Sequence, residues 1–328
     1  MRALLIITIL LFVVFYTNAQ TIERQVIGSA GTTLSNANST IEFSVGETAI
    51  TTISDGTTTI SQGFQQGTVK LLIRIHTKVY LQGAALNPFT GQENLMRDDL
   101  NRDNIIPTTS PYGDGAILDT GIFSIFDQDA VVDWVWVELR NANDNTQVVA
   151  SQSALLQRDG DVLDANYQTL EFEVADGNYY VAIKHRNHLG VMTANTIALS
   201  KTPTIVNFTD ATNQITFGSN AQTTFGMPSG IVAMWSGNAN GDSVVQYSGV
   251  SPDTPAILSE ILNDPGNFLN FPTFAVAKYN PNDVNLDGII QYSGVNPDAP
   301  FILQNVLAHP GNFLNFSTYQ IVEQLPEN

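Results

Sequence analysis

The N-terminal part of the chain alternates polar and apolar side chains in short runs separated by turn-forming residues. Residues 39–45 alternate polar and apolar side chains, and residues 48–53 and 57–60 are rich in threonine and isoleucine. Asp55-Gly56 stands between the latter two runs, and this dipeptide is a strong signal for a two-residue hairpin turn. The pattern predicts a small β module over residues 20–66.

A second series of strand-like runs predicts a separate β domain over residues 67–229. β-Branched and aromatic side chains, which favour strands, dominate these runs. They span residues 69–75, 131–139, 167–174 and 179–184. Helical periodicity is scarce, with one or two turns expected over 93–100. Repeated short strands punctuated by glycine, asparagine and aspartate are typical of a β-sandwich, so the predicted fold class is mainly β.

The last part of the chain, residues 230–328, contains an internal duplication. Residues 238–253 match residues 283–298, and each position of the second copy lies 45 residues after its counterpart, as Asp283 lies 45 residues after Asn238. The heptapeptide Pro-Gly-Asn-Phe-Leu-Asn-Phe recurs at the same offset, at 265–271 and 310–316. A match of this length at one offset identifies a repeated unit. An apolar stretch after each loop predicts a short α-helix.

The second copy carries the alternating oxygen-bearing side chains of a calcium loop. Asp283, Asn285 and Asp287 stand at alternate positions, and Gly288 follows where the loop must turn sharply. This matches the first half of an EF-hand-type loop, whereas the twelfth position, a glutamate in EF-hands, is Gly294. The further predicted ligands are the carbonyl of Ile289, the side chain of Gln291 (directly or through water) and the carboxylate of Asp298, which would close the site from the start of the helix.

The first copy has fewer carboxylates and has Ser243 in place of Gly288, so we expect it to bind calcium more weakly. Its predicted ligands, at the equivalent positions, are Asn238, Asn240, Asp242, the carbonyl of Val244, Gln246 and Asp253. The alternative interpretation is that both copies are asparagine- and aspartate-rich turns that cap helices and bind no metal.

The first 19 residues have the layout of a secretory signal peptide. Arg2 gives a positive start, residues 4–16 form an apolar run, and Ala19 offers a small residue before the expected cleavage site at Gln20. The apolar run is shorter than the roughly 20 residues of a membrane-spanning helix, which makes a retained anchor the less favoured alternative. We therefore expect a secreted or cell-surface protein with no membrane span after cleavage.

Composition narrows the partner classes. The chain contains no cysteine, and its 13 lysine and arginine residues against 31 aspartate and glutamate residues give a formal net charge of −18. Disulfides and thiolate nucleophiles are therefore excluded. Nucleic acid binding needs clustered cations, so the acidic balance argues against it and favours attraction of divalent cations.

The central region contains one dense polar cluster, a candidate ligand-binding site made of His185, Arg186, Asn187 and His188. The two histidines are three residues apart, which is the wrong parity for one face of a strand. A zinc site would need a third ligand, for which His76 is the candidate. The favoured interpretation is a polar strand end whose side chains bind loop backbone.

A weaker echo of the calcium pattern occurs at Asp99, Asn101, Asp103 and Asn104. Arg102 adds an opposing charge there, and asparagine adopts the left-handed turn less easily than glycine. No Gly-x-Ser-x-Gly or His-Glu-x-x-His motif occurs, so no catalytic residue is assigned and we do not expect an enzyme.

Two resemblances follow from these motifs. The paired Asp-x-Asn-x-Asp-Gly loop and helix, over 238–253 and 283–298, resembles a dockerin, a calcium-binding module that docks on a partner. The runs Ile27-Gly-Ser-Ala-Gly, Ser44-Val-Gly-Glu and Gln62-Gly-Phe-Gln-Gln resemble a module of secreted Bacteroidota proteins. The segments 132–140 and 184–190 resemble secreted proteins of that phylum that are labelled hemagglutinin-like. These resemblances imply an adhesive surface protein.

The expected function is therefore that of an exported, calcium-stabilised binding protein. Its partner would be a protein or a carbohydrate at the cell exterior, with the repeat as a docking or stalk module. Two alternatives stay open: a secreted hydrolase or enzyme subunit with its catalytic centre around His185 and His188, and a structural component of a surface assembly.

Overall fold

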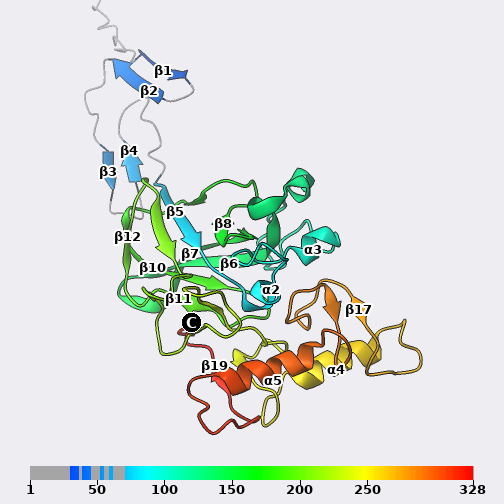
Figure 1. Ribbon diagram of the computed structural model, residues 1–328. Coiled ribbons are helices and arrows are strands. Elements are labelled where there is room, and N and C mark those ends of the chain that lie inside the picture. The colour runs from blue at the N-terminus through cyan, green and yellow to red at the C-terminus, as the bar shows by residue number, and fades with distance from the viewer. Residues whose placement is uncertain (1–29, 37–38, 46–51, 55–58, 62–70, 328) are drawn as a thin grey trace, which may run out of the picture. The chain divides into compact units, whose positions relative to one another are not determined.

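The computed structural model describes residues 30–36, 39–45, 52–54, 59–61 and 71–327 of the chain (Figure 1). The fold is mainly β, which confirms the predicted class, with mostly antiparallel pairing and few short helices. The predicted signal peptide, residues 1–19, lies outside the described residues. The chain divides into two compact units, Met1–Val69 and Lys70–Asn328. Among the described residues, no helix is long and apolar enough to cross a membrane.

The first unit contains two antiparallel strand pairs. Strand β1 (Ala30–Asn36) pairs with β2 (Ser39–Val45), the strand that the alternation predicts. Strand β3 (Thr52–Ser54) pairs with β4 (Thr59–Ser61), whereas the predicted turn residues Asp55-Gly56, between them in sequence, lie outside the described residues. The two shorter runs therefore pair with each other, as expected for a hairpin.

A sheet of nine strands forms the centre of the second unit. Its path runs β11-β10-β6-β7-β8-β5-β13, and β12 and β9 pair with β10 and β5 respectively. All of these pairings are antiparallel except that of β13 with β5. The strands are β5 (Ile73–Lys78), β6 (Val131–Asn141), β7 (Asp144–Gln157), β8 (Asp161–Leu163), β9 (Leu170–Phe172), β10 (Gly177–Lys184), β11 (Val191–Met192), β12 (Ile197–Leu199) and β13 (Thr204–Asn207).

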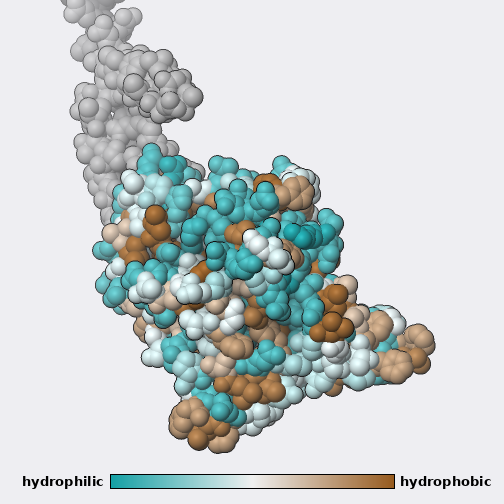
Figure 2. Space-filling view, viewed as in Figure 1, coloured by the Kyte–Doolittle hydropathy of each residue, from teal (hydrophilic) through white to brown (hydrophobic). Residues whose placement is uncertain are grey.

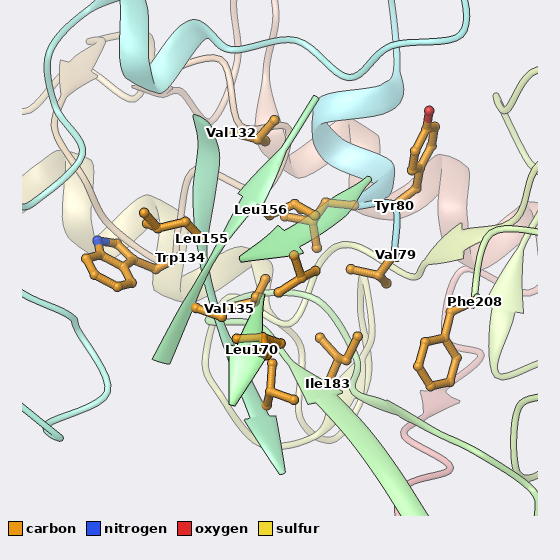
Figure 3. Packing of buried hydrophobic residues seen from close by; sticks show 14 of the residues in the cluster. Val79, Tyr80, Val132, Trp134, Val135, Leu155, Leu156, Leu170, Ile183 and Phe208 are labelled. Carbon is orange, nitrogen blue, oxygen red and sulfur yellow. The ribbon is translucent and has the colours of Figure 1, made fainter. Parts of the chain in front are cut away.

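The core of this unit gathers around β6, which is covered on both faces. Its side chains are buried almost throughout instead of in alternation, because other segments pack against both sides of the sheet. In Figure 3 Trp134 lies beside Leu155 on one side of the sheet, whereas Val135 lies with Leu170 and Ile183 on the other side. The strands expected to form a β-sandwich thus belong to one continuous hydrogen-bonded sheet.

Short helices and two-residue strands complete the second unit. The helices are α2 (Gln82–Ala85), α3 (Asp99–Arg102), α4 (Thr254–Asn263) and α5 (Asp298–Ala308), with 3-10 turns η1 (Thr120–Ser124) and η2 (Asp127–Asp129). The short strands are β14 (Gln222–Thr223), β15 (Ala233–Met234), β16 (Val244–Val245), β17 (Val276–Ala277), β18 (Ile289–Ile290) and β19 (Ile321–Val322). Helix α5 begins at Asp298 and α4 begins directly after Asp253, so a helix follows each loop as predicted.

The two copies of the repeat exchange strands. In the first copy, β16 pairs with β19, which follows the helix of the second copy. Strand β18 of the second copy pairs in the same way with β17, which follows the helix of the first. Residues 276–277 and 321–322 are 45 positions apart, so the exchange is reciprocal. Each loop is therefore held by the other copy, and α4 and α5 lie beside each other (Figure 1).

The repeat has a hydrophobic cluster of its own but packs into the same compact unit as the central sheet. Ile257 and Ile261 of α4 meet Ile302 and Val306 of α5 in this cluster. The two clusters also exchange members: Leu286 of the second loop belongs to the core around β6, whereas Leu189 of the central region belongs to the cluster of the repeat. The predicted domain boundary at residue 229 thus falls inside one compact unit.

The two heptapeptides form exposed apolar tips at the far ends of the helix pair. Phe268 and Phe313 are each 82% exposed, and Leu269, Phe271, Leu314 and Phe316 are also exposed. Figure 2 shows brown atoms at both lower corners of the molecule, where Figure 1 places the loops that follow α4 and α5. Within each tip one buried asparagine, Asn267 or Asn312, binds backbone on both sides of the turn, so the apolar side chains are held in place.

Candidate cation-binding loops

The second loop has the backbone of a tight oxygen-lined turn. Leu286 and Gly288 adopt φ angles of 55° and 84°, at the fourth and sixth positions of the loop. The carboxylate of Asp283 accepts hydrogen bonds from the backbone nitrogen atoms of Asp287 (3.2 Å) and Gly288 (3.0 Å). Asn285 also accepts from Asp287 N, and Asp287 accepts from Ile289 N. The alternating side chains therefore fold the loop around themselves.

Asp298 joins the two ends of this loop. Its Oδ1 accepts hydrogen bonds from the backbone of Val284 (2.8 Å) and Asn285 (3.3 Å), and its Oδ2 accepts one from Gln291 N (2.8 Å). The carboxylate is fully buried. Asp298 thus lies where the sequence predicts a closing residue, and its contacts in the structure are with backbone N–H groups.

The first loop repeats this geometry. Asp253 accepts hydrogen bonds from Ala239 N (2.7 Å), Asn240 N (3.2 Å) and Gln246 N (2.8 Å). Gly241 and Ser243 take the left-handed φ angles, 74° and 64°. The equivalence extends through the whole loop, although a serine at the sixth position adopts this conformation less readily than a glycine does.

Burial raises the pKa of the carboxyl groups in both loops. The pKa of Asp283 is raised to about 7, mainly by burial and in part by repulsion from Asp287. Burial, followed by repulsion from Asp283 and Asp287, raises the pKa of Asp298 well above its usual range. In the first loop burial raises the pKa of Asp253 to about 7. Ionised carboxylates at these places are costly unless a cation neutralises them.

The two glutamines at the ninth position brace turns. Gln246 accepts from Ser251 N (2.9 Å) and donates to the carbonyl of Thr318 (2.7 Å). Gln291 accepts from Val295 N (3.2 Å) and donates to the carbonyl of Thr273 (3.5 Å). Each glutamine thereby ties its own turn to the segment that follows the other copy's heptapeptide, and its role as a metal ligand stays a prediction.

Side chains of the central region donate hydrogen bonds to the backbone in and just before the second loop. The sequence did not reveal these contacts. Arg97 donates to the carbonyl of Asn285 (2.6 Å), and Ser236 donates to that of Val284. Arg186 donates to the carbonyl of Asn280. At Gly83 of α2 a Cβ would overlap the carbonyl oxygen of Val284, so glycine permits this close approach. The second loop is therefore built into the central unit.

Asn187 connects the starting positions of both loops. Its side-chain nitrogen donates to the carbonyls of Pro281 (2.9 Å) and Asp283 (2.6 Å). Its own carbonyl accepts from Gly237 N (3.0 Å) and Asn238 N (3.1 Å). The residue is fully buried. This one asparagine, from the cluster that the sequence singled out, thus fixes the distance between the two loops.

The histidines of that cluster form a buried chain of hydrogen bonds. Both lie after the end of β10, where the chain turns, and this brings His185 Nδ1 to 3.0 Å from His188 Nδ1. Gly83 N donates to His188 Nε2 (3.0 Å), and His185 Nε2 lies 3.1 Å from Asp133 Oδ2. Burial lowers the pKa of both histidines. The lowered pKa values favour the neutral form of both rings, and the hydrogen bonds brace the interior at this point.

Asp133 is the charged end of this chain. Burial acts to raise its pKa, but Arg186 and the hydrogen bonds from His185 and Tyr279 outweigh that effect and hold the pKa at about 2. Arg186 also lies over the ring of Tyr279, 4.4 Å from its centre. His76, the candidate third zinc ligand, is exposed on β5 and contacts Thr169, so the structure does not bring the three histidines together.

The echo at 99–104 forms a helical turn, α3, instead of an open loop. Asp99 pairs with Arg97, and Asp103 lies against the second loop, where its carboxylate would be 3.3 Å from a Cβ at Gly288. Asp99 and Asp103 therefore lie beside the second loop and do not form a loop of their own.

Among the described residues, no three His, Asp or Glu side chains are already arranged around one metal position. A cation in either loop would therefore depend on amide and main-chain oxygen atoms as well as carboxylates. That donor set is the one calcium prefers, and the loop offers it at Asp283, Asn285, Asp287 and the carbonyl of Ile289. The residues present fit a hard cation.

The chain was also compared with models of protein families, with curated proteins and with solved structures, and no match was found.

Proposed function

We propose that the protein is an exported binding protein whose duplicated loops take up calcium and thereby hold the C-terminal repeat in a fixed conformation. The partner is a protein or a carbohydrate at the cell exterior. The signal-like first 19 residues and the acidic surface support this assignment. The resemblance to dockerins and to hemagglutinin-like proteins points the same way.

One observation carries the calcium part of the proposal. Asp283, Asp287 and Asp298 lie near one another at the second loop, where burial raises the pKa of each, and repulsion from the neighbouring aspartates of the loop adds to this at Asp283 and Asp298. A bound divalent cation replaces that repulsion by attraction and compensates for lost hydration. Calcium binding would then be coupled to the stability of the loop and its helix.

Calorimetric titration of the mature protein with calcium, together with melting curves in calcium and in chelator, tests this proposal. We expect two binding events of unequal affinity and a higher melting temperature in calcium. Asp287→Asn should weaken one event, whereas Asp176→Asn, in the turn before β10, serves as the matched control. The absence of both heat and a melting shift would reduce the loops to metal-free turns.

A further inference from the structure

A cleft of about 850 Å³ opens beside the second loop. Its two sides come from parts of the chain that are distant in sequence: residues 86–103 around α3 on one side, and the second loop with the start of α5 on the other. Figure 1 shows the cyan α2–α3 segment next to the orange segment that leads into this loop. The volume falls within the range of about 300–1,000 Å³ that is usual for ligand sites.

Four polar side chains that line this cleft are exposed and make no hydrogen bond within the described part of the chain, so they are free to contact a ligand. They are the side chains of Asn87, Asp103, Asn296 and Gln304. By contrast, the arginine that lines the same cleft, Arg97, already donates hydrogen bonds to Asp99 and to three backbone carbonyls. The groups left for a ligand are therefore three amides and one carboxylate.

This set of groups selects a neutral ligand rich in hydroxyl groups. An amide both donates and accepts hydrogen bonds, and a hydroxyl does the same, so the two match in either direction. Asp103 adds an acceptor for hydroxyl donors. Anionic ligands are disfavoured, because Asp99, Asp103 and Asp287 all line the cleft and the one arginine is already paired.

Apolar side chains border the polar groups. Ile289 and Val295 line the cleft and are 39% and 90% exposed. Such side chains match the C–H faces of a sugar ring, whereas its hydroxyl groups point sideways to the amides. We propose that this cleft binds a neutral oligosaccharide.

The inference rests on the proposed binding function and names its ligand. Asn285, Asp287 and Ile289 of the second loop all line the cleft, so the loop forms part of its surface. A cation that orders this loop also orders the site. Oligosaccharide affinity should accordingly be higher in calcium than in chelator.

The mature protein should be screened against neutral oligosaccharides of glucose, mannose, galactose and xylose, and a bound one measured by calorimetry. We expect Gln304→Ala and Asp103→Asn each to weaken binding about threefold to tenfold, the usual effect of one lost hydrogen bond. The control is Ser259→Ala on α4, the position equivalent to Gln304 in the first copy, which does not line the cleft. The side chains of Gln304, Asp103 and Ser259 are all exposed, so the fold should be unaffected.

Several results would overturn the inference. The first is that both cleft variants bind the oligosaccharide as tightly as the unchanged protein. The second is that the protein prefers a lysine-rich peptide or an acidic oligosaccharide, and the third is that no neutral oligosaccharide binds. If calcium binds but no sugar does, the inference fails and the proposed calcium loops stand. If sugar binds equally in calcium and in chelator and no calcium is taken up, the cleft stands and the calcium proposal fails.

Discussion

At the residue that opens each loop, the chain carries an aspartate in one copy and an asparagine in the other. Asp283 accepts a hydrogen bond from Asp287 N at 3.2 Å, and Asn238 accepts one from Asp242 N at 3.0 Å. Either side chain therefore supports the loop conformation. At this position the two copies differ in negative charge, and the charge of the ligands is the property that tunes calcium affinity.

Exchanging these two residues should exchange the affinities of the loops. Asp283→Asn removes one carboxylate and should weaken the tighter calcium event by roughly tenfold, or about 1.4 kcal/mol. Asn238→Asp should strengthen the weaker event by a similar factor. Calorimetric titration with calcium measures both affinities in each single variant and in the variant that carries both substitutions. If both affinities stay as they are, the loops' charge does not control metal uptake.

Asn187→Ala should destabilise the second unit. The change leaves the buried carbonyls of Pro281 and Asp283 without their donor, and each such group costs about 1–3 kcal/mol. We expect the free energy of unfolding in chelator to fall by about 2–4 kcal/mol, measured by denaturant titration. Gln152→Ala, which removes an exposed side-chain bond to the backbone, is the control. A loss as small as that of the control would show that Asn187 does not tie the loops together.

Sequence reasoning at this scale finds residues whose spacing is local. The alternation of Asp283, Asn285 and Asp287 is visible in the chain, and the structure places them in one loop. It could not find Arg97 or Ser236, which hold the same loop from 188 and 48 residues away. Nothing in the surrounding residues marks either as a partner of that loop.

At the scale of elements, strand prediction succeeded where apolar runs are continuous. The run at 131–139 corresponds to β6, and the run at 179–184 lies within β10. The longest strand, β7, was missed because its first nine residues are mostly polar and partly or fully exposed, with burial only from Ser153 onward. The reciprocal strand exchange of the repeat was equally hidden, because a fixed offset reveals duplication but not which copy pairs with which.

The exchange makes a prediction about truncation. Removing residues 318–328 deletes β19, so Val244–Val245 of the first loop loses its backbone partner although it lies more than 70 residues earlier. Amide hydrogen exchange should speed up at residues 244–246 and stay slow at 289–290, whose partner β17 is retained. Val322→Ser, which alters only an exposed side chain, should leave both regions protected. Equal loss of protection in both loops would argue against separate reciprocal pairs.

The exposed tips make a second prediction at this scale. Phe268→Ser together with Phe313→Ser should change the free energy of unfolding by no more than about 0.5 kcal/mol, because exposed side chains contribute little to folding. Asn267→Ala should cost about 1–3 kcal/mol, since it leaves the buried carbonyl of Ile261 without a donor. Denaturant titration distinguishes the two. A large loss in the double variant would mean that the tips pack against the rest of the chain.

At the scale of the whole molecule, the central sheet and the repeat are parts of one unit. Composition and periodicity change near residue 230, and this predicts two domains. Physically, however, a loop that donates Leu286 to the central core and receives hydrogen bonds from Arg97, Ser236 and Asn187 cannot be detached without leaving buried polar groups unpaired. The repeat is therefore a dependent part of the molecule, unlike a free-standing docking module.

The same buried carboxyl groups would link the proposed calcium binding to pH. The pKa of Asp283 and of Asp253 is about 7 in the folded chain, against 3.8 for an ordinary aspartate. Because these values are raised, the stability that the protonated groups contribute is fully present below about pH 4 and is lost as the pH rises through 7. Calcium competes with those protons. Its stabilising effect should therefore be large at pH 8 and small at pH 5.

Melting curves in calcium and in chelator, recorded at both pH values, measure this dependence. The pKa values of His185 and His188 are lowered, so their protonation on acidification destabilises the folded chain. This loss of stability is the same with and without metal. The difference between the two melting temperatures at one pH therefore isolates the carboxyl groups. A difference that is as large at pH 5 as at pH 8 would mean that calcium binds elsewhere, because a cation in these loops must displace the protons that Asp283 and Asp253 take up.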